Sequence, residues 1–409
     1  MMKKLDKIIS EIAPEINSAN KYQINEIKHL LEAVCFHDSS SEKSHEFEKR
    51  FAKVFSVKHA ISCNSGTSGL HAALYAAGVG PGDEVIVPAL TVIMDTYCAL
   101  HLSATPVFVD VNEETHLISL DAIKAAITPK TKVIVTVSWE GLSCDMEPIM
   151  ELARANNIIV VDDSARTVLG YYNGKLAGTI ADISVFSFEA KKHLSAGGEG
   201  GMIVSNNEEL AQRARKFAGI GYRHLTADAG RTHLALEAVQ NPNYKRFDTI
   251  GLNYRMNEVS AAIGLGQLER IEEIVGRRKA VGKMYEDISN GYDWFVPQRT
   301  PTNCVHAYYT FSVDFKPTAH DHDAWQAFYR RYVEKTGDGF YGVVAIPYLE
   351  PALSGKHLGN QVCAEGLCPV AEGLQQRVMC FKTNYRDLLE AESKVEKLSN
   401  ILTQFNSSN

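Results

Sequence analysis

The first segment that could do chemistry is NSGTSG at 64–69, between an apolar run and a helical pattern. Gly66 lets the backbone approach an anion closely. The free N–H groups of a helix start, together with the hydroxyls of Thr67 and Ser68, could bind a phosphate there. A plain helix N-cap would leave the same pattern, so the segment by itself favours neither interpretation.

An acidic pair, Asp162 and Asp163, ends the apolar run NIIVV. A carboxylate at that point could bind a metal, orient a base or pair with a protonated ring nitrogen. It could equally cap the strand, which by itself is the simpler interpretation.

A lysine pair, Lys191 and Lys192, lies between a strand that ends at Ser187 and a glycine-rich stretch. A lysine amine becomes a nucleophile when its ammonium form is disfavoured, or when it is held as a Schiff base. A solvated lysine pair on a loop would look similar. The density of glycine argues for a ligand, because it lets the backbone crowd around one.

The fourth segment, GLNYRMNE at 251–258, precedes a long helical pattern, and Asn253, Arg255 and Glu258 could simply cap that helix. The order of the four segments is more informative than any one of them. A phosphate loop, an acid about 100 residues later and a lysine about 30 residues beyond it resemble the layout of the aspartate-aminotransferase-like (fold type I) pyridoxal phosphate enzymes.

The four segments lie in or close to a region, from residue 57 to about 205, in which short apolar runs alternate with helical patterns. The strands and helices predicted there must position the candidate residues. Several of the runs are apolar throughout, as expected of strands covered by helices on both faces of a mostly parallel sheet. We therefore predict an α/β fold. The runs are HAISC, DEVIVPA, TPVFVDV, KVIVTVS, NIIVVDD, ISVFSF and GGMIVS.

The rest of the chain frames this sheet. Residues 1 to about 40 have helical periodicity, and 39–44 is expected to be a loop. A polar stretch at 222–247 is expected to be an insertion, and 256–288 one long helix whose charges lie on its exposed side. We predict three parts: an N-terminal helical segment (1–44), a large cofactor-binding domain (45–275) and a small C-terminal α/β domain (276–409).

The bulk properties of the 409 residues are ordinary, with 45% hydrophobic residues and a net charge of −7. The sequence has no basic cluster of the kind that would predict binding to nucleic acid. It also has no apolar run long enough to predict a membrane-spanning helix. The eight cysteines are scattered without CxxC spacing, and we expect no metal site. Reduced thiols and the lack of a signal-peptide pattern at the start favour the cytoplasm.

The chain resembles the DegT/DnrJ-type sugar aminotransferases over roughly residues 20–400. The matching stretches are FE..FA (Phe47, Glu48, Phe51 and Ala52), NSGTSGL (64–70), GDEVIVPALT (82–91), ATPVFVDV (104–111), the acidic pair, SFEAKKHLSAGGEGG (187–201), GLNYRMNEVSAAIGLGQLE (251–269) and CPVAEGL (368–374). The resemblance implies the pyridoxal-phosphate-dependent transferase fold of type I, with a mostly parallel seven-stranded sheet flanked by helices.

The resemblance implies a role for each matching residue. Lys192, followed by His193, would bind pyridoxal 5′-phosphate covalently and shuttle a proton. Asp163 would keep the pyridinium nitrogen protonated, so that the ring stays an electron sink. The other expected cofactor contacts are Gly66, Thr67, Ser68, Val92, Arg166, Ser187 and, from the neighbouring subunit of a homodimer, Asn253.

The implied reaction moves an amino group from L-glutamate, or glutamine, to a keto-sugar that is usually nucleotide-linked, in amino-sugar or surface-polysaccharide biosynthesis. Other relatives are pyridoxal-phosphate-dependent dehydratases, in which a histidine replaces the lysine, enzymes that dehydrate and aromatise carbocycles, or cyclitol aminotransferases. Lys192 argues against the dehydratases only. A non-catalytic regulatory relative is a further alternative, although Lys192 and Asp163 are both present.

Several positions depart from the family pattern. Val92 stands where an aromatic residue commonly stacks on the cofactor ring, and Arg166 where glutamine or histidine is usual. Arg166 could meet the phenolate oxygen or an anionic group of the substrate. Glu189 replaces an aromatic residue or histidine, SWEG at 138–141 replaces HLYG, and Gly197–Gly198 adds a glycine. These changes leave the cofactor chemistry intact and make the substrate uncertain.

Overall fold

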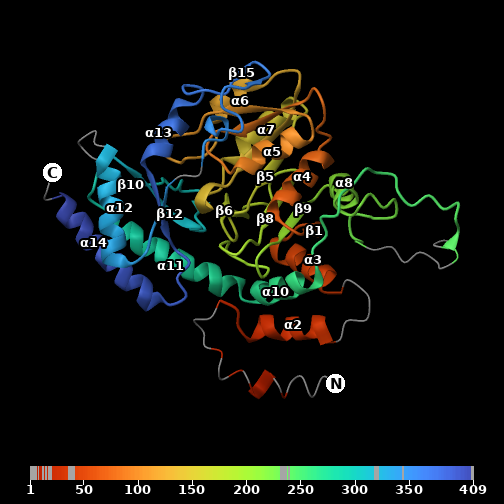
Figure 1. Ribbon diagram of the computed structural model, residues 1–409, viewed down its shortest axis with the longest axis horizontal. Helices are drawn as coiled ribbons and strands as arrows, with labels where there is room; N and C mark the ends of the chain where they lie inside the picture. Colours follow the sequence, from red (N-terminus) through yellow and green to blue (C-terminus); the bar gives the residue numbers. More distant parts are fainter. Residues whose placement is uncertain are drawn as a thin grey trace.

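The computed structural model describes residues 21–35, 42–230, 240–316, 322–342 and 345–406, together with 7, 9–11, 13, 16 and 237. Figure 1 shows a large part built around a central sheet and a smaller part beside it that carries the C-terminal helix. Within the described residues, no helix is both long and apolar enough to cross a bilayer.

Seven strands form the central sheet, as predicted, in the order β1-β9-β8-β5-β4-β2-β3. Strand β9 runs antiparallel to its two neighbours, and all the other paired strands run parallel. The strands are β1 (His59–Cys63), β2 (Glu84–Pro88), β3 (Thr105–Val109), β4 (Thr131–Val137), β5 (Ile159–Asp163), β8 (Ile183–Ser187) and β9 (Gly201–Ser205). The predicted mostly parallel α/β sheet is therefore confirmed.

Helices cover both faces of this sheet, because successive residues of a strand point to opposite sides. Val185 of β8 belongs to one hydrophobic core, and the next residue, Phe186, belongs to the other, where Phe47 and Phe51 pack. The helices around the sheet are α3 (Glu42–Phe55), α4 (Gly66–Ala76), α5 (Ile93–His101), α6 (Leu120–Ala126), α7 (Met146–Ala155) and α8 (Glu208–Ala218). Burial on both faces explains why these strands are apolar throughout.

The predicted N-terminal helical segment is described mainly through α2 (Ile24–Cys35), which lies along α10 (Glu258–Glu269) (Figure 1). The rest of that segment falls largely outside the described residues. The predicted loop at 39–44 is shorter than expected, because α3 already begins at Glu42; residues 39–41 lie outside the described residues.

The single long helix predicted over 256–288 is wrong. Two helices, α10 and α11 (Ile271–Ser289), meet at Arg270, whose φ of −113° and ψ of 19° interrupt the helical backbone. The Arg270 guanidinium donates to the Lys21 carbonyl (3.2 Å) and to Glu26 (3.0 Å). Both contacts join the break to the segment around α2, more than 200 residues earlier, so no local sequence pattern could predict them.

The smaller part contains a second sheet in the order β10-β12-β16-β13, covered by helices α11, α12 (His322–Thr336) and α14 (Leu388–Asn406). Its strands are β10 (Phe295–Pro297), β12 (Thr310–Phe315), β13 (Tyr341–Gly342) and β16 (Val378–Lys382). The remaining elements are β6 (Tyr171–Tyr172), β7 (Lys175–Leu176), β11 (Cys304–Val305), β14 (His357–Leu358), β15 (Gln361–Val362), α13 (Pro369–Arg377) and the short 3₁₀ turns η2 (Trp139–Gly141) and η3 (Pro347–Leu349). The domain limits at 44 and 275 remain predictions, and α11 runs across the second.

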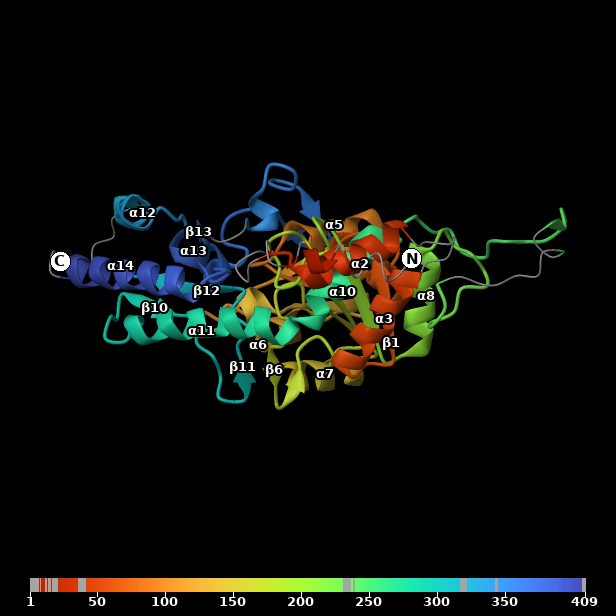
Figure 2. The same cartoon turned by 90° about the horizontal axis from the view of Figure 1, so that it is seen from below.

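Between α8 and α10 the chain leaves the body of the molecule and returns to it, as Figures 1 and 2 both show. An isolated bridge joins Tyr222 to Phe247, which are the ends of the predicted insertion. Residues 231–236 and 238–239 of that insertion lie outside the described residues. The described residues before this gap pack on α8 and β1: Leu225 and Ala227 are buried, and Asp228 lies 2.6 Å from the ring of His59. Most of the described residues at 240–247 are exposed.

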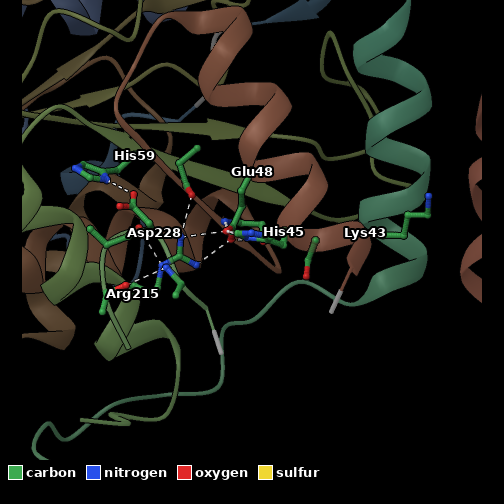
Figure 3. Close-up of polar contacts among 12 residues, drawn as sticks. Lys43, His45, Glu48, His59, Arg215 and Asp228 are labelled. Carbon is green, nitrogen blue, oxygen red and sulfur yellow. Dashed lines mark hydrogen bonds and ion pairs between the residues drawn. The ribbon is translucent and has the colours of Figure 1, made fainter. Parts of the chain in front are cut away.

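A buried ion pair joins α3 to α8 (Figure 3). The Arg215 guanidinium donates to both carboxylate oxygens of Glu48, at 3.1 and 3.0 Å, and the Ser62 N–H donates to Glu48 at 2.8 Å. Burial by itself would raise the pKa of Glu48, but the Arg215 charge and these hydrogen bonds hold it at about 2. The ion pair connects Glu48, one of the residues that match the family, to α8, 167 residues further along the chain. The hydrogen bond from Ser62 connects Glu48 to β1.

Glu48→Gln is expected to lower the free energy of unfolding by about 3–5 kcal/mol, because it leaves the buried Arg215 without a counter-charge. Since the pKa of Glu48 is depressed on folding, its contribution is present above the ordinary value of 4.5 and is lost as the pH falls towards 2. The variant should lose this part of the acid sensitivity in urea titrations. Glu46→Gln, on the same helix but paired at the surface with Arg50, is the matched control. An equal loss in both variants would contradict the prediction.

Candidate active site

The carboxyl ends of three neighbouring strands bring the predicted residues to one edge of the sheet. Val137 of β4, Asp163 of β5 and Val185 of β8 lie next to one another in register. Ser187 ends β8, and the lysine pair follows in the next loop. Ligands bind at this edge in open α/β sheets, so the strand order itself assembles a candidate site.

The loop that carries Lys192 is closed at its base by backbone hydrogen bonds. The N–H of Phe188 donates to the Gly200 carbonyl (2.8 Å), and the N–H of Ala190 donates to the Gly198 carbonyl (2.9 Å). Gly198 has φ of +147°, a conformation that glycine adopts readily and other residues do not. The glycine-rich stretch is therefore needed for the shape of this loop.

Arg278 of α11 fixes the same loop from outside. Its guanidinium donates to the backbone carbonyls of Lys191 (3.0 Å), Lys192 (3.0 Å) and Tyr309 (2.8 Å). Burial lowers the pKa of Arg278 to about 10. The sequence predicted charges on the exposed side of this helix, and for Arg278 that is wrong: the side chain is buried and satisfied by carbonyl oxygens.

The Lys192 amine is partly buried, 5.0 Å from the centre of the Tyr309 ring. Burial and the positive charge of Arg166 lower its pKa to about 8, while Asp163 and Glu140 act in the opposite direction. A larger fraction of the amine is therefore unprotonated near neutral pH than for a solvated lysine, as a nucleophilic lysine requires. Lys191, by contrast, is exposed.

Asp163 and Asp162 have different environments. Asp163 is buried and accepts the Ala165 N–H at 2.9 Å; burial raises its pKa, against the attraction of Lys192 and Arg166. Asp162 accepts hydrogen bonds from Thr136 (2.8 Å) and Ser164, and burial raises its pKa to about 6. Asp163 is the carboxyl that interacts electrostatically with Lys192.

The start of α4 lies against the end of β8. A Cβ on Gly66 would approach the Cβ of Ser187 to 2.9 Å, so only glycine allows this contact. Ser65 caps the helix and accepts the Ser68 N–H, which leaves the first backbone N–H groups, at Gly66 and Thr67, for a ligand. The Ser68 hydroxyl already donates within the cap, to Asn64 (2.6 Å). The turn is therefore a helix N-cap formed by Ser65 and Ser68, and the phosphate site expected at its first N–H groups stays a prediction.

Two of the departures from the family pattern, Glu140 and Arg166, form a buried ion pair with each other. The Arg166 guanidinium lies 4.3 Å from the Trp139 ring and 5.3 Å from the Tyr309 ring. Thr310 donates its hydroxyl to the second oxygen of Glu140. The guanidinium is thus held between two aromatic rings, next to Lys192.

Replacing each member of this pair should move the pKa of Lys192 in opposite directions. Arg166→Gln removes a charge that lowers this pKa, so the pKa should rise; Glu140→Gln removes a charge that raises it, so the pKa should fall. The rate at which an amine-labelling reagent modifies Lys192 in the cofactor-free chain, followed against pH by mass spectrometry, measures both shifts. Shifts in the same direction would contradict this electrostatic account.

Two further predicted residues, Val92 and Asn253, make no hydrogen bond to Lys192 or Asp163 among the described residues, although the Val92 carbonyl accepts the N–H of Asp95 at 3.3 Å. Val92 immediately precedes α5, and its side chain is half-buried. Asn253 is exposed and accepts a hydrogen bond from Arg255 (3.2 Å); among the described residues, no hydrogen bond joins it to the other predicted site residues. Its contribution to a site in the same subunit is therefore not supported.

Sequence reasoning missed Tyr309 and Asp95. Tyr309 belongs to none of the matching stretches, yet its ring centre lies 5.0 Å from the Lys192 amine and 5.3 Å from the Arg166 guanidinium. Asp95 is buried beside Asp163; burial and the Asp163 charge raise its pKa, and its Oδ1 lacks a hydrogen-bond partner among the described residues. An acidic residue in the first turn of a helix is too common to have signalled this position.

The model of the DegT/DnrJ/EryC1/StrS aminotransferase family matches residues 17–390. The GDP-perosamine synthase of Caulobacter vibrioides is 43% identical over 242 residues, which are 59% of this chain and 60% of that protein, less than two thirds of its length. A UDP-N-acetyl-3-dehydro-alpha-D-glucosamine 3-aminotransferase of Acidithiobacillus ferrooxidans is 34% identical over 81% of each chain. The crystal structure of an aminotransferase from Psychrobacter cryohalolentis superposes with a TM-score of 0.82 at 28% identity, covering 93% of this chain and 97% of that one.

Proposed function

The chain belongs to the DegT/DnrJ/EryC1/StrS aminotransferase family, and from that premise we propose that it aminates a nucleotide-linked keto-sugar with L-glutamate as the donor. It is a sugar aminotransferase of this family, and its cofactor is pyridoxal 5′-phosphate. The donor, the nucleotide and a role in polysaccharide biosynthesis are parts of the proposal.

The residues present fit this cofactor. The free N–H groups of Gly66 and Thr67, with the Ser187 hydroxyl against them, are suited to its phosphate. The buried Asp163 is suited to a protonated ring nitrogen, and it lies beside Asp95, one oxygen of which has no hydrogen-bond partner among the described residues. When bound, the cofactor supplies an electron sink for the bonds around the amino carbon.

Lys192 is the residue that we propose as the catalytic acid and base. With a pKa of about 8, its amine can take up and return a proton near neutral pH. Arg278 holds the loop on which the amine is carried, and Tyr309 flanks the amine on one side. The single observation that carries the proposal is this lysine, partly buried beside Asp163 at the carboxyl edge of the sheet.

The substrate class rests on the relatives. Those of Caulobacter and Acidithiobacillus are named for a GDP-linked and a UDP-linked sugar, and they share a nucleotide-linked hexose as the common chemistry. A dehydratase is disfavoured, because Lys192 stands where such relatives carry histidine.

We further propose that the enzyme is a homodimer with shared active sites, in which Asn253 reaches the cofactor phosphate of the partner subunit. The support is the surface around Asn253, where large apolar side chains are exposed on the projecting segment and after it. They are Tyr222, Phe247, Ile250 (93% exposed), Leu252 and Val259. Apolar side chains gathered in this way favour an interface with another chain.

The function is tested by mixing the cofactor-loaded enzyme with L-glutamate and following its visible absorption and the release of 2-oxoglutarate. We expect one equivalent of 2-oxoglutarate per site, with loss of the visible band, and recovery of the band when the accepting keto-sugar is added. A cofactor-loaded enzyme that responds to neither glutamate nor glutamine would exclude the proposed donor.

A further inference from the structure

Asp95 is a buried carboxyl to which the proposed function assigns no role. It lies in the first turn of α5, the helix that follows β2 at the carboxyl edge of the sheet, and the residue is 1% exposed. Helix α5 packs against α4, and the Cys98 S–H donates to the Thr67 carbonyl (3.6 Å). The helix therefore adjoins the turn that we expect to hold the cofactor phosphate, and Asp95 lies within the candidate active site.

The two oxygens of Asp95 have different environments. The Thr91 hydroxyl donates to Oδ2, while Oδ1 is buried and has no hydrogen-bond partner among the described residues. Buried polar atoms are normally hydrogen-bonded, so this oxygen calls for a partner. An ionised oxygen would need a donor or a cation, whereas a protonated oxygen needs an acceptor.

The charged groups that face Asp95 come from the end of β5 and from the loop after it. Asp163 and Asp162 repel a negative charge on Asp95, and Arg166 attracts one. Arg166 already forms a buried ion pair with Glu140, so it offsets little of the repulsion. Burial and the Asp163 charge raise the pKa of Asp95 well above its usual range. Two buried carboxyls side by side cannot both ionise readily, so one of them keeps a proton.

Asp163 is the member of the pair that is better able to stay ionised. It accepts the Ala165 N–H through Oδ1 (2.9 Å), and the positive charges of Lys192 and Arg166 lower its pKa against the effect of burial. Asp95 has a hydroxyl donor only, from Thr91. The proton therefore belongs on Asp95, and the Asp163 carboxylate is the nearby acceptor that this proton requires.

We propose that Asp95 carries a proton on Oδ1 and donates it to Asp163 in a hydrogen bond, so that the pair holds one negative charge against the ring nitrogen of the cofactor. Asp95 is then a positioning residue, which acts through Asp163 by keeping that carboxyl ionised and oriented. A carboxylate has about four acceptor sites, so Asp163 can accept from Asp95, from Ala165 and from the ring nitrogen together. The inference rests on the proposed function for the place of the ring nitrogen, and the proton on Asp95 is independent of it.

Infrared difference spectroscopy of the cofactor-free, full-length chain tests the proton. At neutral pH, the spectrum of the unsubstituted chain minus that of Asp95→Asn should contain the C=O stretch of one protonated carboxyl. In an Asp163→Asn background the same band should disappear at a lower pH, because the charge that holds the proton on Asp95 is gone. Asp121→Asn is the control: Asp121 also lies in the first turn of its helix, but its side chain is 93% exposed, and its removal should delete no such band.

The pH profile of the glutamate half-reaction in the cofactor-loaded enzyme tests the role of the proton. Asp95→Asn keeps a donor for Asp163 and an acceptor for Thr91, so the acid limb of its profile should stay in place, whatever its rate. Asp95→Leu has a similar shape but no donor, so the pKa of Asp163 should rise. Its acid limb should move upwards by about one pH unit, the effect of one hydrogen bond to a charged group.

Absence of the band, or a band whose titration is the same in the Asp163→Asn background, would overturn the inference. An acid limb that moves equally in Asp95→Asn and Asp95→Leu, or in neither, would also overturn it. The infrared bands need neither cofactor nor amino donor, and the response of the unsubstituted enzyme to glutamate tests the proposed function separately. The two can therefore fail independently.

Discussion

Lys192→Ala is expected to abolish amino transfer from glutamate, with a loss on the order of 10⁴-fold or more. The substitution removes both the covalent anchor of the cofactor and the group that moves the proton, and each is a major catalytic contribution. The cofactor-loaded variant should lack the visible absorption of the lysine-linked cofactor. Release of 2-oxoglutarate in a single turnover measures the loss.

Lys191→Ala is the matched control, because the neighbouring lysine is exposed and its hydrogen bonds to Arg278 and Glu189 use only its backbone carbonyl and N–H. The substitution also removes a contact of the Lys191 amine with the Tyr341 ring, at 5.3 Å. It should keep most of the activity. The Lys192 variant should also fold normally, since the amine that it removes is partly buried without an ion pair among the described residues, and removing such a charge costs little stability. Loss of activity in Lys191→Ala with retention in Lys192→Ala would reverse our assignment.

The sequence predicted the sheet and the chemistry at its edge because both leave local patterns. Strands buried on two faces are apolar throughout, and polar residues end β5 and β8 at the edge where ligands bind in open α/β sheets. The loop after β8 was recognisable from its glycines, and Gly198 does adopt a positive φ.

What the sequence could not predict depends on pairs of residues far apart in the chain. Glu140 and Arg166 were each noted as departures, but nothing local indicates that they neutralise each other, with Thr310 as a third partner. Similarly, Arg278 has the spacing of a solvent-facing helix residue, and only the folded chain reveals the carbonyls that bury it. Likewise, the residue at the break between α10 and α11, Arg270, donates a hydrogen bond to Glu26, more than 200 residues earlier in the chain.

A basic cavity beside Lys192 also depends on residues far apart in the chain. The basic residues that line it with Lys192 are Lys21, Arg270, Arg277, Arg278, Lys382 and Arg386. Its cations come from both ends of the chain and from the α10–α11 junction, so no segment of the sequence has an unusual charge. The net charge of the whole chain is −7, which by itself gives no indication of a basic site. A local excess of positive charge in an acidic protein is a property of the tertiary structure, and it becomes visible only when the walls meet.

Asp163→Asn is expected to reduce the rate of amino transfer by about 10²–10³-fold, the usual effect of removing one preorganised charge from a reacting group. Asparagine has nearly the same shape as aspartate and can still accept the Ala165 N–H, so the change is electrostatic. Without the carboxylate, the ring nitrogen of the cofactor loses its counter-charge. The rate of the glutamate half-reaction measures the effect.

The charge of Asp163 also acts on Lys192, because it raises the pKa of that amine. In Asp163→Asn the pKa of Lys192 should therefore fall below about 8, and labelling of the amine against pH in the cofactor-free chain should report the shift. Asp162→Asn is the control: its carboxyl is the next in sequence and equally buried, but it bonds to Thr136 and Ser164. An effect on rate and pKa that is confined to Asp163 identifies the carboxyl that faces the cofactor, and equal effects in both variants would reduce Asp163 to a structural residue.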